Sequence, residues 1–136
     1  MTLELKHLAP YLPYELKVMR NINGQSFIIE IKESSLFYVS IVHQDKPILH
    51  PLLDLTKEIE VDGEKFVPID RLRKELPVLN QWRFNNETLE FYSLNYGRFY
   101  GLAVMPFMVV QRLFEMHFDV FGLIGEGLAI DKNTLK

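Results

Sequence analysis

Apolar and polar positions alternate with a period of two through much of the first half of the chain, which predicts strands. The first two such runs are Leu16–Ile22 and Gln25–Ile31, and Asn-Gly at 23–24 separates them. Asn-Gly favours the positive φ angles of a type I′ turn. A two-residue turn sets Lys17 opposite Glu30, so cross-strand charges agree with this register. The pattern predicts a β-hairpin.

The same logic predicts further strands. Asp-Gly at 62–63 divides the segment 58–69 into a second hairpin, with Ile59 facing Phe66. Apolar and β-branched residues at 36–42 predict a third strand, and residues 82–84 and 88–94 predict two short strands around Asn-Asn at 85–86. Prolines make 10–14 an extended segment and 46–56 a rigid apolar connector.

Helical spacing is confined to two segments. Asp70 is suited to cap a short helix that ends before Pro77. The main helix is predicted to begin at Pro106 and to stop near Gly122, because apolar positions there recur every three or four residues. Together these elements predict an α+β fold in which a small antiparallel sheet built from hairpins packs against a C-terminal helix. With 136 residues, the chain is expected to form a single domain over 1–136.

Composition narrows the classes of function. The net charge of -3 disfavours a generic nucleic-acid-binding module, which concentrates positive charge. The chain has no cysteine, so disulfides, thiolate metal sites and cysteine nucleophiles are excluded. Its first residues lack the apolar core of a signal peptide, and its longest apolar stretch is too short to span a bilayer. We therefore expect a cytoplasmic protein without a membrane partner.

Two motifs invite a catalytic or cofactor reading. His117 and Asp119 form a His-x-Asp pair like that of an iron facial triad, but no histidine follows to complete it. We expect His117 to meet the last helical carbonyls and Asp119 to be solvated or to cap the next turn. Gly122, Gly125 and Gly127 follow a helix instead of a strand, so they are expected to serve turns and not a phosphate loop. No catalytic residue, metal site or cofactor is predicted.

Two sets of residues remain as candidate binding positions. Aromatic residues and arginines alternate between 82 and 100, a composition found in cores, in protein interfaces and on surfaces that stack nucleic-acid bases. Acidic residues surround the second predicted turn. The candidates are Trp82, Arg83, Tyr96, Arg98 and Tyr100 in the first set, and Glu58, Glu60 and Glu64 in the second.

Three stretches of the chain resemble an uncharacterised family of small proteins encoded in phage and prophage genomes. They are LAPYLPY at 8–14, KPILHPL at 46–52 followed by DLTKEI at 54–59, and HFDVFGLI at 117–124 with GLAID at 127–131. The resemblance implies a virus-derived accessory protein made in the cytoplasm of a bacterial host, and it implies no catalytic residue.

These observations favour a non-enzymatic accessory protein that binds a host protein. A small acidic domain is suited to a basic groove, so the hypothesis includes a counter-defence factor that inhibits a nucleic-acid-targeting nuclease or its ribonucleoprotein complex, as anti-CRISPR proteins do. The alternative is a nucleic-acid-associated accessory protein of phage replication or recombination that uses Arg83, Arg98 and nearby aromatics. A homodimer that buries the apolar connector is also left open.

Overall fold

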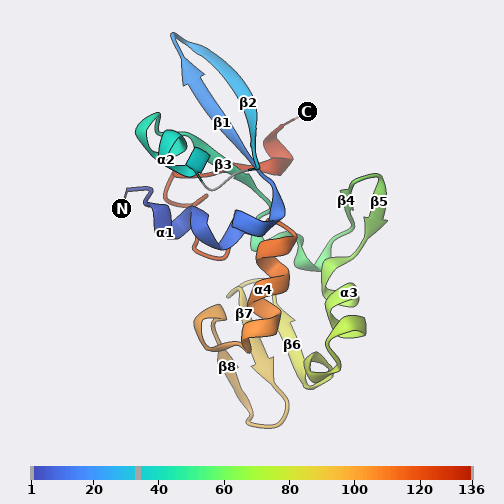
Figure 1. Cartoon of the computed structure of the whole chain (residues 1–136). Coiled ribbons are helices and arrows are strands. Elements are labelled where there is room, and N and C mark those ends of the chain that lie inside the picture. Colours follow the sequence, from blue (N-terminus) through green and yellow to red (C-terminus); the bar gives the residue numbers. More distant parts are fainter. Residues whose placement is uncertain (1, 33–34, 136) are drawn as a thin grey trace. The chain divides into compact units, whose positions relative to one another are not determined.

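The computed structural model describes residues 2–32 and 35–135, and their contacts divide the chain into two compact units (Figure 1). Unit 1 comprises Met1–Pro51 and Leu113–Lys136, and unit 2 comprises Leu52–Arg112. Unit 2 is thus an insertion in the sequence of unit 1. The fold is α+β, as predicted, with small antiparallel sheets and a C-terminal helix. The expectation of a single domain over 1–136 stays a prediction.

Unit 1 is built on a four-stranded sheet in the order β2-β1-β3-β9. Its strands are β1 (Leu16–Ile22), β2 (Gln25–Ile31), β3 (Lys46–Leu49) and β9 (Ile130–Asp131). The predicted hairpin is confirmed, with Lys17 paired to Glu30 and positive φ angles of 50° at Asn23 and 83° at Gly24. The short β9 pairs parallel to β3, which joins the end of the chain to its middle.

The strand next to β1 is β3, which lies in the segment predicted as an irregular connector. Pro47 pairs with Val18, a position at which a missing amide matters little because Val18 directs its own backbone groups toward β2. Ile48 and Leu49 are buried within the chain, as is Leu55 farther along the same connector. These three side chains are therefore not available to line a dimer.

The helical segments of unit 1 differ from the sequence predictions at two places. Its helices are α1 (Leu5–Leu8), η1 (Ala9–Tyr14), α2 (Ser35–Val42) and η5 (Lys132–Thr134). The segment 10–14, predicted as extended, lies in the 3-10 helix η1. The run 36–42, predicted as a strand, lies in α2, which ends where Gln44 takes a φ of 56°. A short run that is apolar throughout has no period that separates strand from helix.

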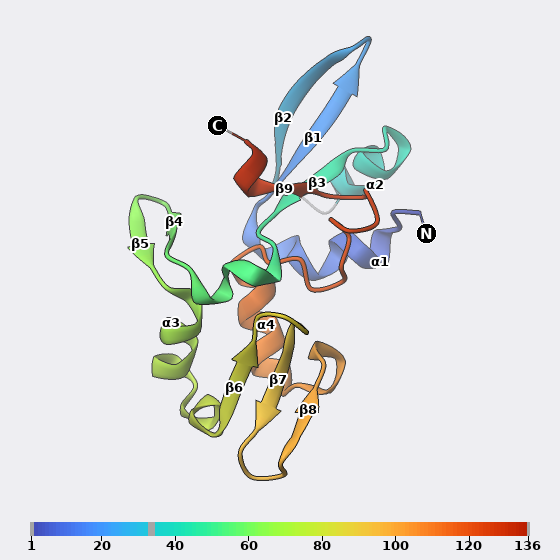
Figure 2. The same ribbon diagram turned by 180° about the vertical axis from the view of Figure 1, so that it is seen from behind.

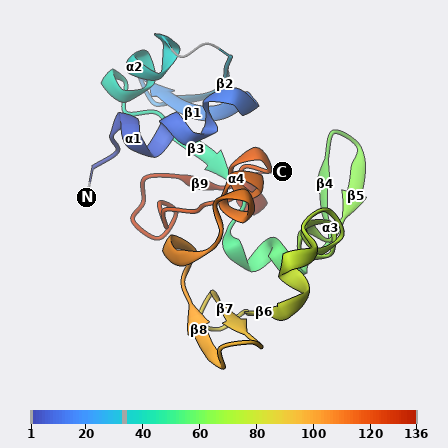
Figure 3. The ribbon, with the colours of Figure 1, turned by 60° about the horizontal axis from the view of Figure 1, so that its bottom comes forward.

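The core of unit 1 gathers side chains from both ends of its sequence. Tyr11 and Leu49 are fully buried in it, and α1 and α2 contact one another beside the sheet (Figure 3). The cluster consists of Leu8, Tyr11, Leu16, Val18, Ile31, Leu49, Leu123 and Ala129. Since Leu123 and Ala129 follow the insertion, unit 1 completes its core only with the last residues of the chain.

Unit 2 carries two small sheets and a helical segment between them. Its elements are η2 (Leu52–Thr56), β4 (Ile59–Val61), β5 (Glu64–Phe66), α3 (Pro68–Glu75), η3 (Pro77–Gln81), β6 (Trp82–Asn85), β7 (Glu90–Ser93), β8 (Arg98–Tyr100) and η4 (Leu102–Val104). The β4–β5 hairpin has the predicted register, with Ile59 opposite Phe66. The order β6-β7-β8 forms an antiparallel meander (Figure 2), and β8 was not predicted.

Helix boundaries in and after unit 2 correct two predictions. Val67 is the N-cap of α3, and Asp70 lies in the first turn instead of capping it. Helix α4 (Phe107–Glu115) ends well before Gly122. His117 adopts a φ of 60°, its amide donates to the Phe114 carbonyl, and the Phe118 amide donates to the Leu113 carbonyl. This is the Schellman pattern of a helix end, in which histidine takes the left-handed position that glycine usually occupies.

Candidate functional site

The β6-β7-β8 sheet of unit 2 has one buried face and one open face. Strand pairing sets Phe84, Phe91 and Tyr100 in one row of a face on which Phe91 is only 1% exposed. The row beside it on the other face is Arg83, Tyr92 and Phe99. We call this second face, which also carries Asn85 and Glu90, the open face. The sheet therefore turns one row of aromatic side chains inward and leaves another in contact with solvent.

The candidates Trp82, Arg98 and Tyr100 lie on the same face as Phe91, where Arg98 is exposed. The rings of Trp82 and Tyr100 are both half-buried and meet edge to face, with centroids 5.3 Å apart. The Arg98 guanidinium lies 5.7 Å from the centre of the Tyr100 ring. These contacts give the three residues packing roles at the margin of the sheet.

Arg83 is the basic residue of the open face, and its guanidinium is held close to the backbone. Its Nη1 donates to the Asn80 carbonyl at 3.0 Å and to the Trp82 carbonyl at 2.9 Å. Both hydrogens of that nitrogen are therefore engaged. The other N–H groups of the guanidinium are available to a binding partner, and the two backbone hydrogen bonds fix their orientation.

Phe99 and Tyr96 are the most exposed aromatics of the meander. Phe99 is 46% exposed and packs edge to face on Tyr92, with centroids 5.0 Å apart. Tyr96 is 70% exposed and lies in the turn between β7 and β8. The buried Ser93 accepts a hydrogen bond from the Tyr96 amide at its Oγ (3.1 Å) and one from the Gly97 amide at its carbonyl (2.9 Å). These two hydrogen bonds to Ser93 hold the backbone of the turn that carries Tyr96.

The acidic candidates lie on or beside the other sheet of unit 2 and do not form a patch of one sign. Glu60 pairs with Lys65 across the β4–β5 hairpin. Glu64 forms an ion pair with Arg71, whose guanidinium also stacks 3.5 Å above the ring of Phe66. Glu58 precedes β4 and is exposed. Local basic residues therefore offset much of the charge on this hairpin.

His117 and Asp119 have structural partners. The Nε2 of His117 lies 2.6 Å from the carbonyl oxygen of Tyr14, a segment distant in sequence. The backbone amide of His117 donates to the Phe114 carbonyl, so the expected contact with the last carbonyls of α4 is confirmed for the backbone. Asp119 is 5% exposed and accepts hydrogen bonds from the amides of Leu123 (2.7 Å) and Ile124 (2.9 Å). The expected capping of the next turn by Asp119 is confirmed. No group of three metal-competent side chains occurs within the described ranges.

The turn that Asp119 caps explains two of the three glycines. Gly122 and Gly127 both have a φ of 73°, a backbone conformation that glycine reaches without a Cβ clash. Gly125 has no such angle. The predicted turn function is confirmed, with a left-handed conformation at Gly122 and Gly127 and an ordinary turn conformation at Gly125.

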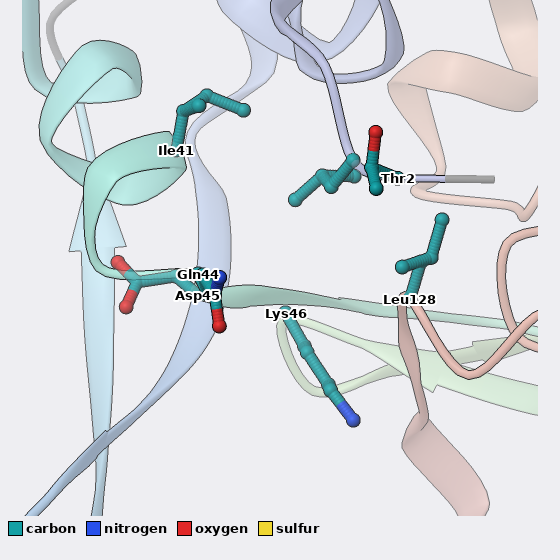
Figure 4. Close-up of a pocket in the computed structure, with 7 residues that line it drawn as sticks. Thr2, Ile41, Gln44, Asp45, Lys46 and Leu128 are labelled. Atoms are coloured by element: carbon teal, nitrogen blue, oxygen red, sulfur yellow. The ribbon is translucent and has the colours of Figure 1, made fainter.

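Sequence reasoning missed a small pocket in unit 1 and the buried ion pair beside it. A cavity of about 290 Å³ is lined by Thr2, Leu3, Ile41, Gln44, Asp45, Lys46 and Leu128 (Figure 4). The Asp45 carboxylate is fully buried and accepts hydrogen bonds from Nε and Nη2 of Arg20, at 2.9 and 2.8 Å. This bond raises the pKa of Arg20. No spacing in the sequence relates Arg20 to Asp45, since β1 and the end of α2 meet only in the fold.

The charge of Asp45 beside the pocket is thus already neutralised by Arg20. The remaining lining is largely apolar, and the Lys46 side chain is directed away from Ile41 (Figure 4). The pocket therefore offers a ligand shape but few polar groups for orienting it.

Comparisons with known proteins give no match. No family model, no curated protein and no solved structure is similar to this chain. The resemblance to phage and prophage proteins therefore stays a prediction. Among the residues that the structure describes, no helix is long and apolar enough to cross a membrane.

Proposed function

We propose that this chain is a non-enzymatic accessory protein of phage or prophage origin, and that it binds a host protein through the open face and Tyr96. The observation that supports this proposal is the exposure of Phe99 on the open face (46%) and of Tyr96 in the β7–β8 turn (70%), whereas Phe91 on the opposite face is 1% exposed. Tyrosine, tryptophan and arginine dominate the energy of protein interfaces. Rigid aromatic side chains also lose little conformational entropy on binding.

The composition of the open face favours a protein partner over nucleic acid. Glu90 lies on the same face as Arg83 and would repel phosphates. One nitrogen of the Arg83 guanidinium is already bound to two carbonyls. Mixed charge beside aromatic rings is typical of the rim and centre of a protein interface.

A host nuclease, alone or in its ribonucleoprotein complex, is one target with suitable chemistry. Its nucleic-acid groove is basic, and Glu58 before β4 would face it together with Glu60 and Glu64 of the β4–β5 hairpin, although Lys65 and Arg71 offset the charges of the two hairpin residues. Reversing these three charges should slow association and flatten its dependence on salt. An unchanged salt dependence would remove this form of the proposal.

The proposal is tested by capturing partners of the tagged protein from host lysate, with one half treated with nuclease. The protein retained after digestion is then purified, and its dissociation constant is measured for variants. We expect Tyr96→Ala and Phe99→Ala each to weaken binding by roughly 30-fold, the scale of an interface hot spot.

Phe107→Ala is the matched control, because Phe107 is 76% exposed at the start of α4 and lies outside the meander. It should bind like the unmodified chain. Equal binding by all three variants would refute the assignment of this surface. Loss of every protein partner after digestion, with nucleic acid in the untreated eluate, would favour the alternative function in replication or recombination.

A further inference from the structure

At one edge of the unit 1 sheet, backbone amides and carbonyls have no neighbouring strand to pair with in the part of the chain that the structure describes. β2 is the terminal strand in the order β2-β1-β3-β9, and the hairpin that it forms with β1 is plainly visible in Figures 1 and 2. Ile28 and Phe27 on this strand are 57% and 46% exposed. A long, apolar edge strand is a template for pairing with another strand.

The turn fixes which backbone groups point outward. In a two-residue hairpin the closing pair, here Ile22 and Gln25, is hydrogen-bonded, and bonded pairs then alternate along the ladder. Phe27 and Ile29 therefore direct their amides and carbonyls toward β1. The amides and carbonyls of Ser26, Ile28 and Glu30 point away from the sheet.

These outward groups are arranged symmetrically about Ile28. We propose that the chain forms a homodimer in which β2 pairs antiparallel with β2 of a second copy, with the two-fold axis at Ile28. In this register Ile28 faces its own counterpart, and Ser26 faces Glu30 of the partner. All the outward amides and carbonyls of Ser26, Ile28 and Glu30 then find partners.

Side chains on both faces agree with this register. Phe27 meets Ile29 of the second copy, an aromatic and β-branched pair of the kind that stabilises sheets. On the opposite face, Met19 pairs with Ile28 within each hairpin, so an apolar row continues from one copy to the other. The Ser26 hydroxyl donates to the side chain of Asn21 within its own hairpin, so a neutral side chain faces the partner's Glu30 and no like charges are opposed.

Other symmetric registers are less favourable. Centring the pair on Glu30 sets two carboxylates directly opposite one another, which destabilises a sheet. Centring it on Ser26 leaves the outward groups of Glu30 unpaired. Two identical β2 strands centred on Ile28 thus pair all their outward groups without opposing like charges, and this self-complementarity selects a second copy of this chain as the occupant. This inference concerns unit 1 and is independent of the proposed function.

The experiment measures the dimer dissociation constant of the full chain by sedimentation over a wide concentration range. Ser26→Arg places a positive charge opposite Glu30 twice in each dimer, and should lower the dissociation constant roughly two- to thirtyfold. Ser26→Glu opposes two like-charged pairs and should raise it by a similar factor. Opposite changes at one exposed position are expected only if Ser26 and Glu30 face each other.

Ile28→Lys sets two ammonium groups against each other at the axis and should raise the dissociation constant at least roughly tenfold. Val42→Lys is the control, because Val42 is 80% exposed in α2 and gains the same charge away from β2. Circular dichroism verifies that each variant is folded. A chain that remains monomeric at roughly 1 mM would overturn the proposal, as would a dimer that is indifferent to Ser26 and Ile28 or equally weakened by Val42→Lys. If β2 instead binds an extended host peptide, the purified chain would be monomeric and would bind a partner only in host lysate, which would also overturn the proposal.

Discussion

Removing the Asp119 carboxylate should destabilise unit 1 more than removing any exposed cap. Asp119 is 5% exposed and accepts bonds from the amides of Leu123 and Ile124 at 2.7 and 2.9 Å. The Leu123 side chain is fully buried in the core, so water cannot replace the lost oxygen at that amide. The Ile124 bond is only partly buried. The two amides should therefore contribute unequally.

The expected loss follows from this geometry. A buried donor left without an acceptor costs about 1–3 kcal/mol, and a partly buried one lies near the lower end of that range. Asp119→Ala should thus reduce the free energy of unfolding by about 2–4 kcal/mol. Asp119→Asn keeps one acceptor oxygen and should lose about half as much. Asp131→Ala is the matched control, because Asp131 caps the exposed amide of Asn133, and its loss should cost about 1 kcal/mol or less.

Urea unfolding followed by circular dichroism gives the free energies, and hydrogen exchange locates the effect. In Asp119→Ala the amides of Leu123 and Ile124 should exchange faster than other amides of unit 1. The reasoning is refuted if Asp119→Ala unfolds within about 0.5 kcal/mol of the unmodified chain, the scale of a neutral surface change, while both amides stay protected.

Three further predictions concern stability. Burial raises the pKa of Tyr11 well above its ordinary value. The free energy of unfolding should therefore be fully retained below about pH 10 and should fall above it, as the phenol ionises in the unfolded chain, by up to about 1.4 kcal/mol per pH unit. Tyr11→Phe should flatten this alkaline decline in urea titrations. Arg20→Met leaves a buried charge at Asp45 and should cost about 3–5 kcal/mol, with part of the loss recovered when Asp45→Asn is added, as a double-mutant cycle would measure. Gly127 has a φ of 73°, so Gly127→Ala should lower the free energy of unfolding by about 1–2 kcal/mol. Gly125→Ala should change the free energy of unfolding by less than about 0.5 kcal/mol.

The hairpins were predictable because their turns carry local information. Asn-Gly at 23–24 and Asp-Gly at 62–63 adopt positive φ angles at both central residues, and each turn fixes its register without help from the rest of the fold. Helix α4 was predictable in type but not in length, because His117 takes a left-handed conformation that no sequence rule assigns to histidine.

Elements that depend on distant partners were not predictable. Composition predicts a strand over 36–42, but this run forms α2, and the strand beside β1 is β3. Pro47 predicts against a strand, yet Val18 opposite it directs its backbone groups toward β2 and needs no hydrogen bond from residue 47. A residue's own neighbours in sequence do not reveal which backbone groups face it across a sheet.

The candidate site shows the same limit. Phe91 and Phe99 are both aromatic residues in short strands, and one is buried while the other is 46% exposed. Their separation follows from the register of β7 with the unpredicted β8. The sequence located the aromatic segment between 82 and 100, and only the pairing of its strands divides it into an inner and an open face.

The inserted position of unit 2 has a consequence for the order in which the chain folds on the ribosome. Residues 52–112 are contiguous, so their contacts are available as soon as they have been synthesised. Unit 1 must wait for Leu123 and Ala129 to fill its core and for Ile130 to pair with β3. Until then the first 51 residues expose apolar surface and an open sheet edge to solvent. We expect stalled chains lacking these last residues to be cleaved by proteases within residues 1–51 while the inserted unit resists, so the part made first is the part that matures last.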